Sequence, residues 1–404
     1  MSDPFLRRVT IRNYKSIAAC KVDLGPLMFL VGPNGSGKSN FLDALRFVAD
    51  ALRISLDYAL RERGSIREVR RRSGGHPTHF SLRLDFVLPS GAGGHYAFRV
   101  GSKPSGGYEV QTEECRIQPM PGLESRFRID SGTVSEASFS PRPASLPDRL
   151  FLVAASGIPE FRPVFDALSR IEVYNLNPRA IAAIQKPDPG EILRRDGSNA
   201  ASVLQQFSPQ EREIILGNLS RIVPGIEGID YKTLGPQETI EFRQIVQDQE
   251  HPWRFLADSM SDGTLRALGV LLAVFQGSMA RSDQPRPLTV GLEEPEIALH
   301  PAAGRVLLGA LREGSRHCQI LVTSHSPDLL DDPNLGVDEL LAVDNLKGST
   351  RIGKIDQAGI DMIHQRLFTA GELLRQNQLA PAANVLADVR HERELDMFDV
   401  DGRA

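Results

Sequence analysis

The stretch Gly32-Pro33-Asn34-Gly35-Ser36-Gly37-Lys38-Ser39 fits the pattern G-x-x-x-x-G-K-[ST] of a phosphate-binding loop. Its glycines permit backbone angles that a side chain would forbid, so that successive N–H groups can point inward at one anion. Lys38 brings a positive charge to the β- and γ-phosphates of a nucleotide, and the hydroxyl of Ser39 is short enough to sit on Mg²⁺. The stretch therefore predicts a site for ATP and Mg²⁺.

The sequence on both sides of this loop supports the same interpretation. Residues 27–31 form a short apolar run, which is typical of a buried strand. After the loop, apolar residues recur at helical spacing up to Leu52, and the N-terminus of such a helix adds a partial positive charge to the phosphate site. An ordinary glycine turn is the alternative, and the strand–loop–helix setting makes it the weaker one.

Length and composition limit the classes of protein that the chain can belong to. Its 404 residues, 41% of them hydrophobic, suggest two or three lobes with real cores. The net charge of -4 means that any contact with nucleic acid must use a local basic patch. Cys20, Cys115 and Cys318 form no metal or disulfide pattern, which fits a reducing compartment. Without a signal peptide or an apolar run of about 20 residues, we expect a cytoplasmic protein with no membrane contact.

The first part of the chain reads mainly as strands. Alternating residues predict two strands within residues 7–24, and further strands at residues 80–86, 95–100 and 108–117. Residues 118–147 contain five prolines, so we expect irregular structure there. Residues 148–156 and 159–169 look helical, and residues 171–174 read as a strand. The first predicted unit is a lobe at residues 1–175, with the phosphate loop and an antiparallel β subdomain.

The second part begins with helices. Residues 179–207 and 209–222 form a helical stretch with a break at residues 196–199, and strands return at residues 228–234 and 238–247. We therefore predict a helical insert at residues 176–227 and a second lobe with a tail at residues 228–404. The tail has a helical stretch at residues 371–376. It ends in an acidic segment, residues 396–401, which is either a frayed end or a peptide that docks on a partner.

An arginine-rich stretch follows the loop helix, at residues 61–72. A solvated face or a mobile loop is one interpretation of such a run. A contact with the phosphate backbone of DNA or RNA is the other. The residues that would make the nucleic-acid contact are Arg63, Arg67, Arg70, Arg71 and Arg72.

Two later stretches could complete a nucleotide site. Ser261-Asp262-Gly263-Thr264 opens a predicted helix, where Ser261 could cap the N-terminus and the free N–H groups could hold an anion; a plain capped helix is the alternative. The apolar residues 287–292 end in the carboxylates Glu293 and Glu294. Beside Mg-nucleotide, one such carboxylate can hold the metal and the other can polarise the attacking water. A solvated acidic turn would be the interpretation only if the phosphate loop were absent.

Two shorter stretches after the carboxylates could also belong to the nucleotide site. Ala298-Leu299-His300-Pro301 comes directly after the carboxylates, and residues 320–326 form another apolar strand that ends in Ser324, His325 and Ser326. A histidine at such a strand end can donate a hydrogen bond to a γ-phosphate. A single histidine would more often be structural, but this one has the expected place in the order.

In this order the motifs resemble those of ABC-type ATPases of the RecF, SMC and overcoming-lysogenisation-defect (OLD) branch. The chain most resembles the compact bacterial ATPases of this branch that have no coiled coil and no Toprim domain. The resemblance covers residues 9–330, roughly. It implies an α/β fold, a P-loop NTPase of ABC type with mixed β-sheets flanked by helices, an antiparallel β subdomain and a helical insert.

The resemblance also implies a role for each motif. Glu294 would be the catalytic carboxylate and His325 the switch histidine, while Ser39 and Glu293 would hold the metal. Residues 298–301 correspond to the D-loop, and residues 261–264 to the ABC signature. Nucleotide contacts are implied for Pro33, Asn34, Gly35, Ser36, Gly37, Lys38, Ser39 and Asn40, and for Ser261, Asp262 and Gly263.

The chain departs from the family pattern at two points. Glu293 stands where an aspartate is usual, but many relatives of this branch read E-E-P-E, so the longer side chain is not taken as inactivating. The glutamine of the Q-loop is harder to find, because Gln111 and Gln118 are the first glutamines after Phe41. Neither lies clearly between a strand and a helix, which leaves the second protein ligand of Mg²⁺ unassigned.

For function, the resemblance implies ATP hydrolysis by two heads that hold ATP between them, the phosphate loop of one facing the signature serine of the other. We expect an ATP-dependent homodimer. The 79 residues after His325 show no acidic cluster of Toprim type, so the chain is expected to work with a separately encoded effector, as the sensor or motor of an anti-phage defence system. The alternatives are a RecF-like DNA-binding ATPase of DNA repair and an ATP-switched scaffold.

Overall fold

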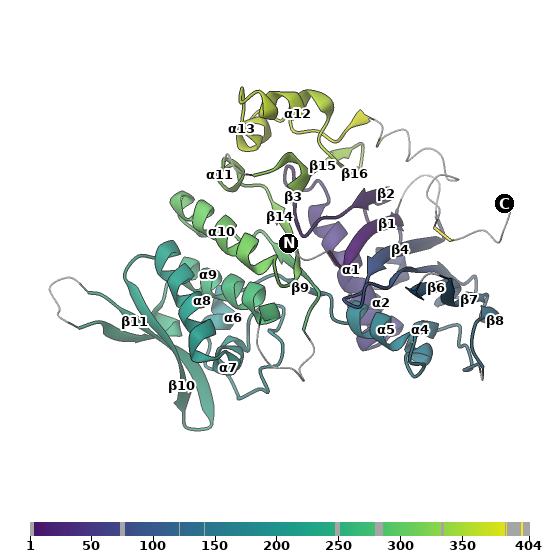
Figure 1. The fold of residues 1–404 in the computed structure, drawn as a ribbon, viewed down its shortest axis with the longest axis horizontal. Helices are drawn as coiled ribbons and strands as arrows, with labels where there is room; N and C mark the ends of the chain where they lie inside the picture. Colours follow the sequence, from purple (N-terminus) through teal and green to yellow (C-terminus); the bar gives the residue numbers. More distant parts are fainter. Residues whose placement is uncertain are drawn as a thin grey trace.

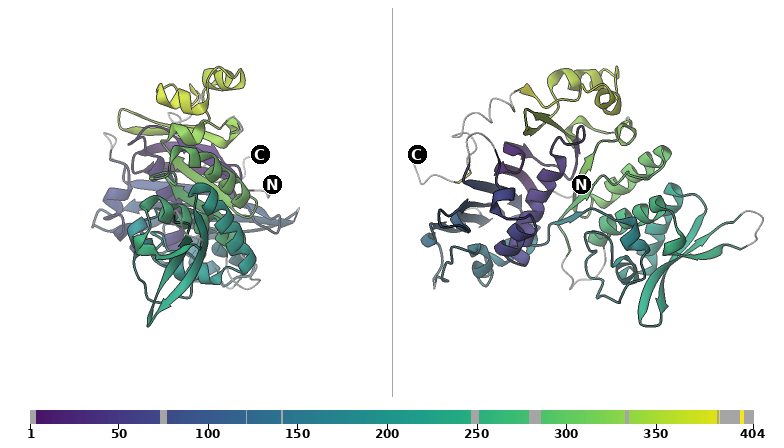
Figure 2. Two further views of the ribbon diagram at one scale, coloured as in Figure 1. Left: turned by 90° about the vertical axis from the view of Figure 1, so that its left-hand side faces the viewer. Right: turned by 180° about the vertical axis from the view of Figure 1, so that it is seen from behind.

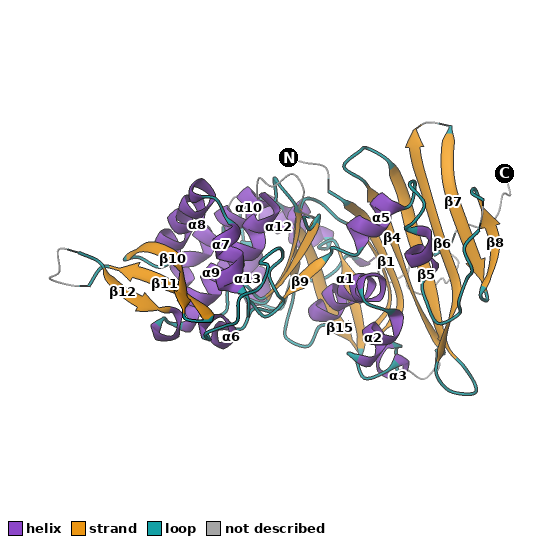
Figure 3. Cartoon of the chain, turned by 90° about the horizontal axis from the view of Figure 1, so that it is seen from below, coloured by secondary structure: helices purple, strands orange, loops and turns teal. Residues whose placement is uncertain are grey.

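One mixed sheet of 13 strands organises the described part of the chain. The computed structural model describes residues 4–72, 77–120, 122–140, 142–246, 251–278, 286–332 and 335–383, together with residues 385, 397 and 398. One half of the sheet is an antiparallel wing, which extends to one side of the molecule in Figure 1 and whose strands are seen at full length in Figure 3. In spatial order the wing contains β8 (Thr133–Ala137), β7 (Leu123–Asp130), β6 (Tyr108–Met120), β5 (Gly93–Ser102), β4 (His79–Val87), β1 (Leu6–Tyr14) and β2 (Ile17–Asp23).

The other half of the sheet is mainly parallel and carries the phosphate loop. Its strands continue the spatial order as β16 (Ser349–Gly353), β15 (Leu340–Leu346), β3 (Leu27–Val31), β14 (Gln319–Ser324), β13 (Thr289–Glu293) and β9 (Glu172–Tyr174). From β15 to β9 each neighbouring pair is parallel, so that the carboxyl ends of β3, β14 and β13 lie at one edge. That edge is where an open parallel sheet binds its ligands.

Strand β3 separates two hydrophobic cores. All five of its residues are buried, and they alternate between the two faces of the sheet. Met28 and Leu30 belong to a core shared with the wing, whereas Leu27, Phe29 and Val31 belong to a second core. Burying a side chain of this size contributes about 1.5–3 kcal/mol, so a run of five apolar residues is what a strand covered on both faces requires.

Helices cover the two cores separately, as the right-hand view in Figure 2 shows. On the wing side lie α1 (Lys38–Arg53), α2 (Leu56–Arg61), α3 (Ile66–Val69), α4 (Phe151–Ala155) and α5 (Arg162–Leu168). On the other side lie α6 (Pro178–Ala182), α7 (Ala200–Gln206), α8 (Pro209–Ile222), α9 (Asp262–Phe275) and α10 (Gly304–Gly314). A separate sheet of β10 (Ile226–Leu234), β11 (Gln237–Gln244) and β12 (Trp253–Leu256) extends beyond α7 and α8.

The C-terminal part of the described chain adds short helices on the side of β15 and β16. They are α11 (Pro327–Leu330), α12 (Gln357–His364) and α13 (Ala370–Arg375), the last of which confirms the helix expected at residues 371–376. Of the acidic end expected at residues 396–401, only Met397 and Phe398 lie within the described residues. No helix of the described ranges is long and apolar enough to cross a membrane. Cys20, Cys115 and Cys318 are free and buried.

Two secondary-structure expectations are wrong. Residues 118–147 are not irregular throughout, because β7 and β8 lie there and extend the wing. Pro119 lies near the end of β6, and Pro143 and Pro147 follow β8, so none of these three prolines lies inside β7 or β8. Residues 179–207 are not one interrupted helix either: only α6 and α7 are helical, and β12 was not expected at all.

Glu113 connects the wing to α4, and its burial makes the stability of the fold depend on pH. Its carboxylate accepts hydrogen bonds from the backbone N–H of Phe151 (2.5 Å), that of Leu152 (2.8 Å) and the hydroxyl of Tyr96 (2.9 Å). Burial raises the pKa of Glu113 from 4.5 to about 7, although the two backbone N–H groups oppose the shift. The folded chain therefore retains this proton at pH values at which the unfolded chain has released it.

We expect the free energy of unfolding to fall as the pH rises. A carboxyl group with a raised pKa contributes stability that is complete below about pH 4.5 and is lost as the pH rises through about 7. The loss from this one group is on the order of 3 kcal/mol. Urea unfolding of wild type and Glu113→Gln at pH 5 and pH 8 tests this. The Gln variant should gain relative to wild type at pH 8, and an equal difference at both pH values would contradict the prediction.

Candidate functional site

The phosphate loop lies between β3 and α1, and its shape depends on two glycines. Gly35 and Gly37 have φ values of 76° and 104°, in the region that glycine favours. A Cβ at Gly37 would lie 2.0 Å from the Thr350 Oγ1 atom, and a Cβ at Gly32 would lie 1.9 Å from the Val343 carbonyl oxygen. The glycines are therefore needed both for the backbone angles and for close packing against β15 and β16.

Lys38 is folded back onto the loop. Its Nζ donates to the carbonyl oxygens of Gly32 (2.8 Å) and Pro33 (3.0 Å). Burial lowers the pKa of Lys38, and the nearby carboxylates of Glu294 and Glu296 oppose that shift. The ammonium group thus lies inside the loop together with an unpartnered buried atom, Ser36 Oγ. This is a cradle in which an anion can be held.

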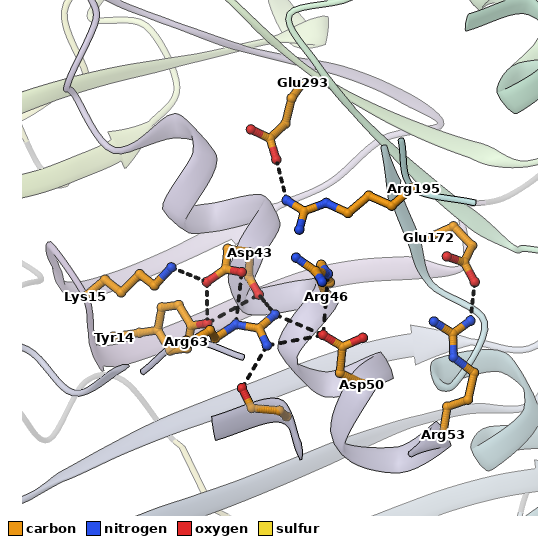
Figure 4. Close-up of polar contacts among 11 residues, drawn as sticks. Tyr14, Lys15, Asp43, Arg46, Asp50, Arg53, Arg63, Glu172, Arg195 and Glu293 are labelled. Carbon is orange, nitrogen blue, oxygen red and sulfur yellow. Dashed lines mark hydrogen bonds and ion pairs between the residues drawn. The ribbon is translucent and has the colours of Figure 1, made fainter. Parts of the chain in front are cut away.

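Ser39 and Glu293 meet at the edge of the sheet. The Ser39 hydroxyl lies near enough to the Glu293 carboxylate, at the end of β13, to lower its pKa. Burial raises the pKa of Glu293, while the charge of Arg195 and the nearby Ser39 hydroxyl oppose the shift. Arg195 Nη2 lies 3.4 Å from Glu293 Oε1, and Figure 4 shows its side chain reaching the carboxylate from the segment before α7.

Glu294 is held in an uncommon backbone conformation. Its φ is 45°, and its N–H donates to the carbonyl oxygen of Thr323 (3.0 Å) and to the Thr323 hydroxyl (3.3 Å). The carboxylate Oε1 lies 2.9 Å from Nδ1 of His325, which follows β14. A non-glycine residue at positive φ costs free energy and often marks a functional site. Here the turn aims a carboxylate at the mouth of the phosphate loop.

Two further charged groups support this turn from behind. Glu296 accepts a hydrogen bond from the Ser324 hydroxyl (2.6 Å), and burial raises its pKa against that bond. Arg266 of α9 donates to the carbonyl oxygens of Glu294 (3.2 Å) and Leu176 (3.1 Å). These contacts fix the backbone between β13 and the D-loop, so the position of Glu294 does not rest on one hydrogen bond.

The signature segment lies at the N-terminus of α9. Ser261 is the N-cap, and its Oγ accepts from the N–H of Thr264 (3.2 Å). Ser261 and Asp262 are exposed. Gly263 packs so closely on the D-loop that a Cβ there would lie 2.5 Å from the carbonyl oxygen of Ala298. The signature and the D-loop therefore form one surface of the chain.

The fold brings together most of the expected site residues of one chain. Lys38, Ser39, Glu293, Glu294 and His325 follow three neighbouring parallel strands and are joined by the contacts above. Asn40 lies beneath the loop, where its side chain donates to Ser16 Oγ. Among the described residues, no hydrogen bond or ion pair joins residues 261–263 to residues 32–39.

The donors of this site suit a magnesium nucleotide. A serine hydroxyl next to a carboxylate is an oxygen pair of the kind that Mg²⁺ takes together with waters and phosphate oxygens. Among the described residues, no group of three or more His, Cys, Asp or Glu is placed to hold a metal. Buried Lys38 and the orphaned Ser36 Oγ are suited to the phosphates.

The family model described as "AAA domain, putative AbiEii toxin, Type IV TA system" matches residues 27–331, which include every motif named above. The chain belongs to this AAA family. With the likenesses below, it is an ABC-type P-loop ATPase of the SMC and OLD branch, as its motif order implied.

Two curated proteins are similar to this ATPase in sequence. It is 23% identical over 360 residues to the OLD nuclease of Thermus scotoductus, covering 81% of this chain and 60% of that protein. The chain thus spans about 60% of the length of that relative. A shorter stretch of 46 residues, 11% of this chain and 4% of the relative, is 54% identical to the chromosome partition protein Smc of Desulfitobacterium hafniense.

Solved structures confirm the fold of the ATPase. An Smc head bound to the C-terminal winged-helix domain of ScpA superposes with a TM-score of 0.56 at 12% identity, covering 88% of this chain and 100% of that one. An Smc head derived from Pyrococcus furiosus, with an extended coiled coil and also bound to ScpA, gives 0.54 at 10% identity, covering 90% and 99%. At such identities these structures show the fold alone.

Sequence reasoning missed Arg195, which pairs with Glu293, and Asn175, whose backbone N–H contacts Arg195. No motif in the sequence points to Arg195, because 98 residues separate it from Glu293. Asn175 follows β9, the strand beside β13, and its N–H donates to the Arg195 carbonyl oxygen (3.1 Å). The two glutamines considered for the Q-loop, Gln111 and Gln118, lie in β6 of the wing. The correctly predicted strand at residues 171–174 could have pointed to Asn175.

The arginine-rich stretch is not a free basic patch in the ATPase, which corrects one expectation. The Arg63 side chain is 4% exposed and forms ion pairs with Asp43 (3.0 Å) and Asp50 (3.2 Å) beneath α1, as Figure 4 shows. Arg70 and Arg71 donate to the backbone carbonyls of Pro77 and Ser16. Arg67 and Arg72 are exposed, and Arg72 pairs with Glu68. Arg63 in particular cannot reach a nucleic acid.

Arg63 instead holds a buried charge cluster together. The charges of Arg63 and Lys15 outweigh burial and lower the pKa of Asp43, whereas burial raises the pKa of Asp50. Truncating Arg63 leaves two carboxylates without their shared partner. Breaking a buried ion pair in this way costs about 3–5 kcal/mol.

We therefore expect Arg63→Leu to lower the free energy of unfolding by about 3–5 kcal/mol without any nucleic acid present. Arg72→Leu is the matched control, because its pair with Glu68 is exposed and such a pair contributes 1 kcal/mol or less, roughly. Urea unfolding of both variants is the measurement. A stable Arg63→Leu protein would contradict the structural role.

Proposed function

We propose that this chain hydrolyses ATP in a Mg²⁺-dependent reaction, with Glu294 as the catalytic carboxylate. The observation that carries the proposal is the meeting of Ser39 with Glu293 and of Glu294 with His325 at one edge of the sheet. Lys38 and the loop N–H groups bind and orient the phosphates. Bound Mg²⁺ would neutralise charge on the phosphate oxygens.

Glu294 and His325 have different roles in the proposed reaction. The positive φ of Glu294 and its two hydrogen bonds to Thr323 place the carboxylate where it can accept a proton from an attacking water. A neutral imidazole carries one N–H, so His325 can donate either to the Glu294 carboxylate through Nδ1 or to a phosphate oxygen through Nε2. Both side chains are partly exposed, at 27% and 37%, so a water and a phosphate can reach them.

We further propose that a second copy of the chain closes the site. A triphosphate needs more positive potential than one helix N-terminus supplies. Ser261 and Asp262 are exposed at the start of α9 and make no contact with the phosphate loop of their own chain within the described residues. A head-to-head homodimer would bring the α9 N-terminus of one copy to the phosphates held by the other.

Mixing two inactive variants tests the dimer. Lys38→Ala removes the loop charge and Ser261→Arg blocks the signature, so each protein alone should be inactive. In a mixture, one composite site combines an intact loop with an intact signature, and ATPase activity should return. Lys38→Ala mixed with Glu294→Gln is the control, because both changes lie on the loop side and no site is complete. A mixture no more active than its parts would remove the dimer.

Arg195 is proposed to bind phosphate once nucleotide is present. It lies 3.4 Å from Glu293, and its buried Nε has no hydrogen-bond partner in the structure. We expect Arg195→Ala to weaken ATP binding by about 10–100-fold, the range for a lost hydrogen bond to a charged group. Arg194→Ala is the control, since Arg194 pairs with Asp188 instead. Titration of a fluorescent ATP analogue measures both, and equal effects would contradict the assignment.

For the biological role we propose the sensor or motor of an anti-phage defence system, working in the cytoplasm with a separately encoded effector. Two observations support it: the family description names a toxin–antitoxin system, and the relative from Thermus scotoductus is named a nuclease. ATP-dependent closure of two heads would pass a signal to the effector.

Phage plaque counts test this role. The gene and its neighbours would be placed in a susceptible bacterium, with Lys38→Ala as the inactive control. Protection should require both the intact ATPase and a neighbouring gene. Protection by the ATPase gene alone would exclude the two-protein scheme, and no protection in any combination would exclude the role. A RecF-like repair ATPase remains the alternative. The basic patch that it would need does not include Arg63, which is buried in an ion pair with Asp43.

A further inference from the structure

The outer face of the wing carries a row of basic side chains. Strand register places Ala19, Arg12, Ser81 and Arg99 side by side across β2, β1, β4 and β5. The neighbouring row contains Lys21, Arg83, the buried Glu114 and Arg128. In this row Arg83 pairs with Asp85, and Arg128 pairs with Glu114 and Asp130. The opposite face of the same strands carries the core residues under α1, so the alternation places these arginines and Lys21 together on the other face, with more basic than acidic side chains.

Two residues near the C-terminus lie on this basic wing face. Met397 is 6% exposed and packs with Ala19 of β2. The Phe398 ring lies 5.3 Å from the guanidinium carbon of Arg99 and 6.0 Å from that of Arg128. The dipeptide thus touches three strands, β2, β5 and β7, that are not neighbours in the sheet.

We propose that the basic wing face is a docking site for the chain's own acidic C-terminal segment, anchored by Met397 and Phe398. The inference is independent of the proposed ATPase role. The sequence around the anchor carries Glu394, Asp396, Asp399 and Asp401 and no basic residue between them, so its charge is opposite to that of the face. Buried Met397 supplies apolar contact, and each arginine over an aromatic ring contributes about 0.5–1 kcal/mol at an exposed site.

The chain can reach this face within one molecule. Val385 is hydrogen-bonded to Ala382 beside β16, and 11 residues lie between Val385 and Met397. Fully extended, such a connection spans up to about 40 Å, which exceeds the spacing of a few strands at about 4.8 Å each. A tether of this length keeps the segment at millimolar effective concentration, so weak contacts are sufficient for docking.

A cysteine pair tests the docking directly. Oxidation of Ala19→Cys/Met397→Cys should give a disulfide within one chain, seen as a monomer with altered mobility on a non-reducing gel. Leu123→Cys/Met397→Cys is the control, because Leu123 is 51% exposed at the turn from β6 to β7 and should not pair. A disulfide only between chains, or equal pairing in both variants, would overturn the proposal.

A peptide experiment separates docking from chance contact. A labelled peptide of residues 391–404 should bind full-length Met397→Ala/Phe398→Ala at least tenfold tighter than wild type, in which the face is occupied. The same peptide with Phe398→Ala should not bind, and 1 M salt should weaken binding because the paired charges are screened. Equal binding to both proteins, or none to the double variant, would overturn the proposal.

Discussion

Glu294→Gln should lower the rate of ATP hydrolysis by about 10²–10⁴-fold, the contribution of a positioned general base, and leave ATP affinity within a few-fold of wild type. The amide keeps the shape of the side chain and the hydrogen bond to His325, but it cannot take a proton from water. Phosphate release under saturating ATP measures the rate, and titration with a fluorescent ATP analogue measures affinity.

Glu296→Gln is the matched control for that experiment. Glu296 lies two residues further along the same turn and accepts a hydrogen bond from Ser324. It supports the backbone and, unlike Glu294, does not pair with His325. We expect a loss of less than about tenfold, corresponding to a hydrogen bond of 1.4 kcal/mol or less. If both variants lost the same activity, Glu294 would not be distinguished as the base.

Gly37→Ala should abolish measurable ATP binding, with a loss of at least about 100-fold. The new Cβ would lie 2.0 Å from Thr350 Oγ1, and the φ of 104° is strained for any residue with a side chain. Strain of this kind costs about 1–3 kcal/mol before the clash is counted. Since Thr350 also donates to the Ser36 carbonyl (2.8 Å), relief of the clash would distort the loop itself.

Gly35→Ala separates the two effects. Gly35 also has positive φ, at 76°, but a Cβ there would meet no atom within 4 Å. It should therefore lose roughly tenfold in affinity from backbone strain alone. Isothermal titration with ATP and Mg²⁺ compares the variants, and thermal unfolding shows whether each is folded. A folded Gly37→Ala protein with normal affinity would contradict this account of the loop.

The phosphate loop, the carboxylate pair and the histidine could be predicted because each is local in sequence. The pattern of residues 32–39 specifies a loop between a strand and a helix whatever the rest of the chain does. Glu294 and His325 follow apolar runs that are short enough to be buried strands. Parallel strands then bring their carboxyl ends to one edge without any further information.

The rest depended on contacts between distant residues. Arg63 reads as a surface charge in its own stretch, and only Asp43 and Asp50 of α1 make it a buried ion-pair partner. The sequences of β7 and β8 alone give only a weak strand signal. These strands form because β6 offers β7 an edge to pair with, and β7 in turn pairs with β8. The division of the chain at residues 175 and 227 stays a prediction.

The hydrogen bonds around Ser36 have a mechanical consequence. Thr350 of β16 is bonded both to the Ser36 carbonyl and to Ser16, in the turn between β1 and β2. The nucleotide cradle is therefore braced by a hairpin more than 300 residues away in sequence. Removing those hydrogen bonds, for example with Thr350→Val, should weaken binding of the triphosphate without altering any residue that contacts it. Loss of the chain beyond about residue 340 should likewise disable the cradle, even though every nucleotide motif would remain.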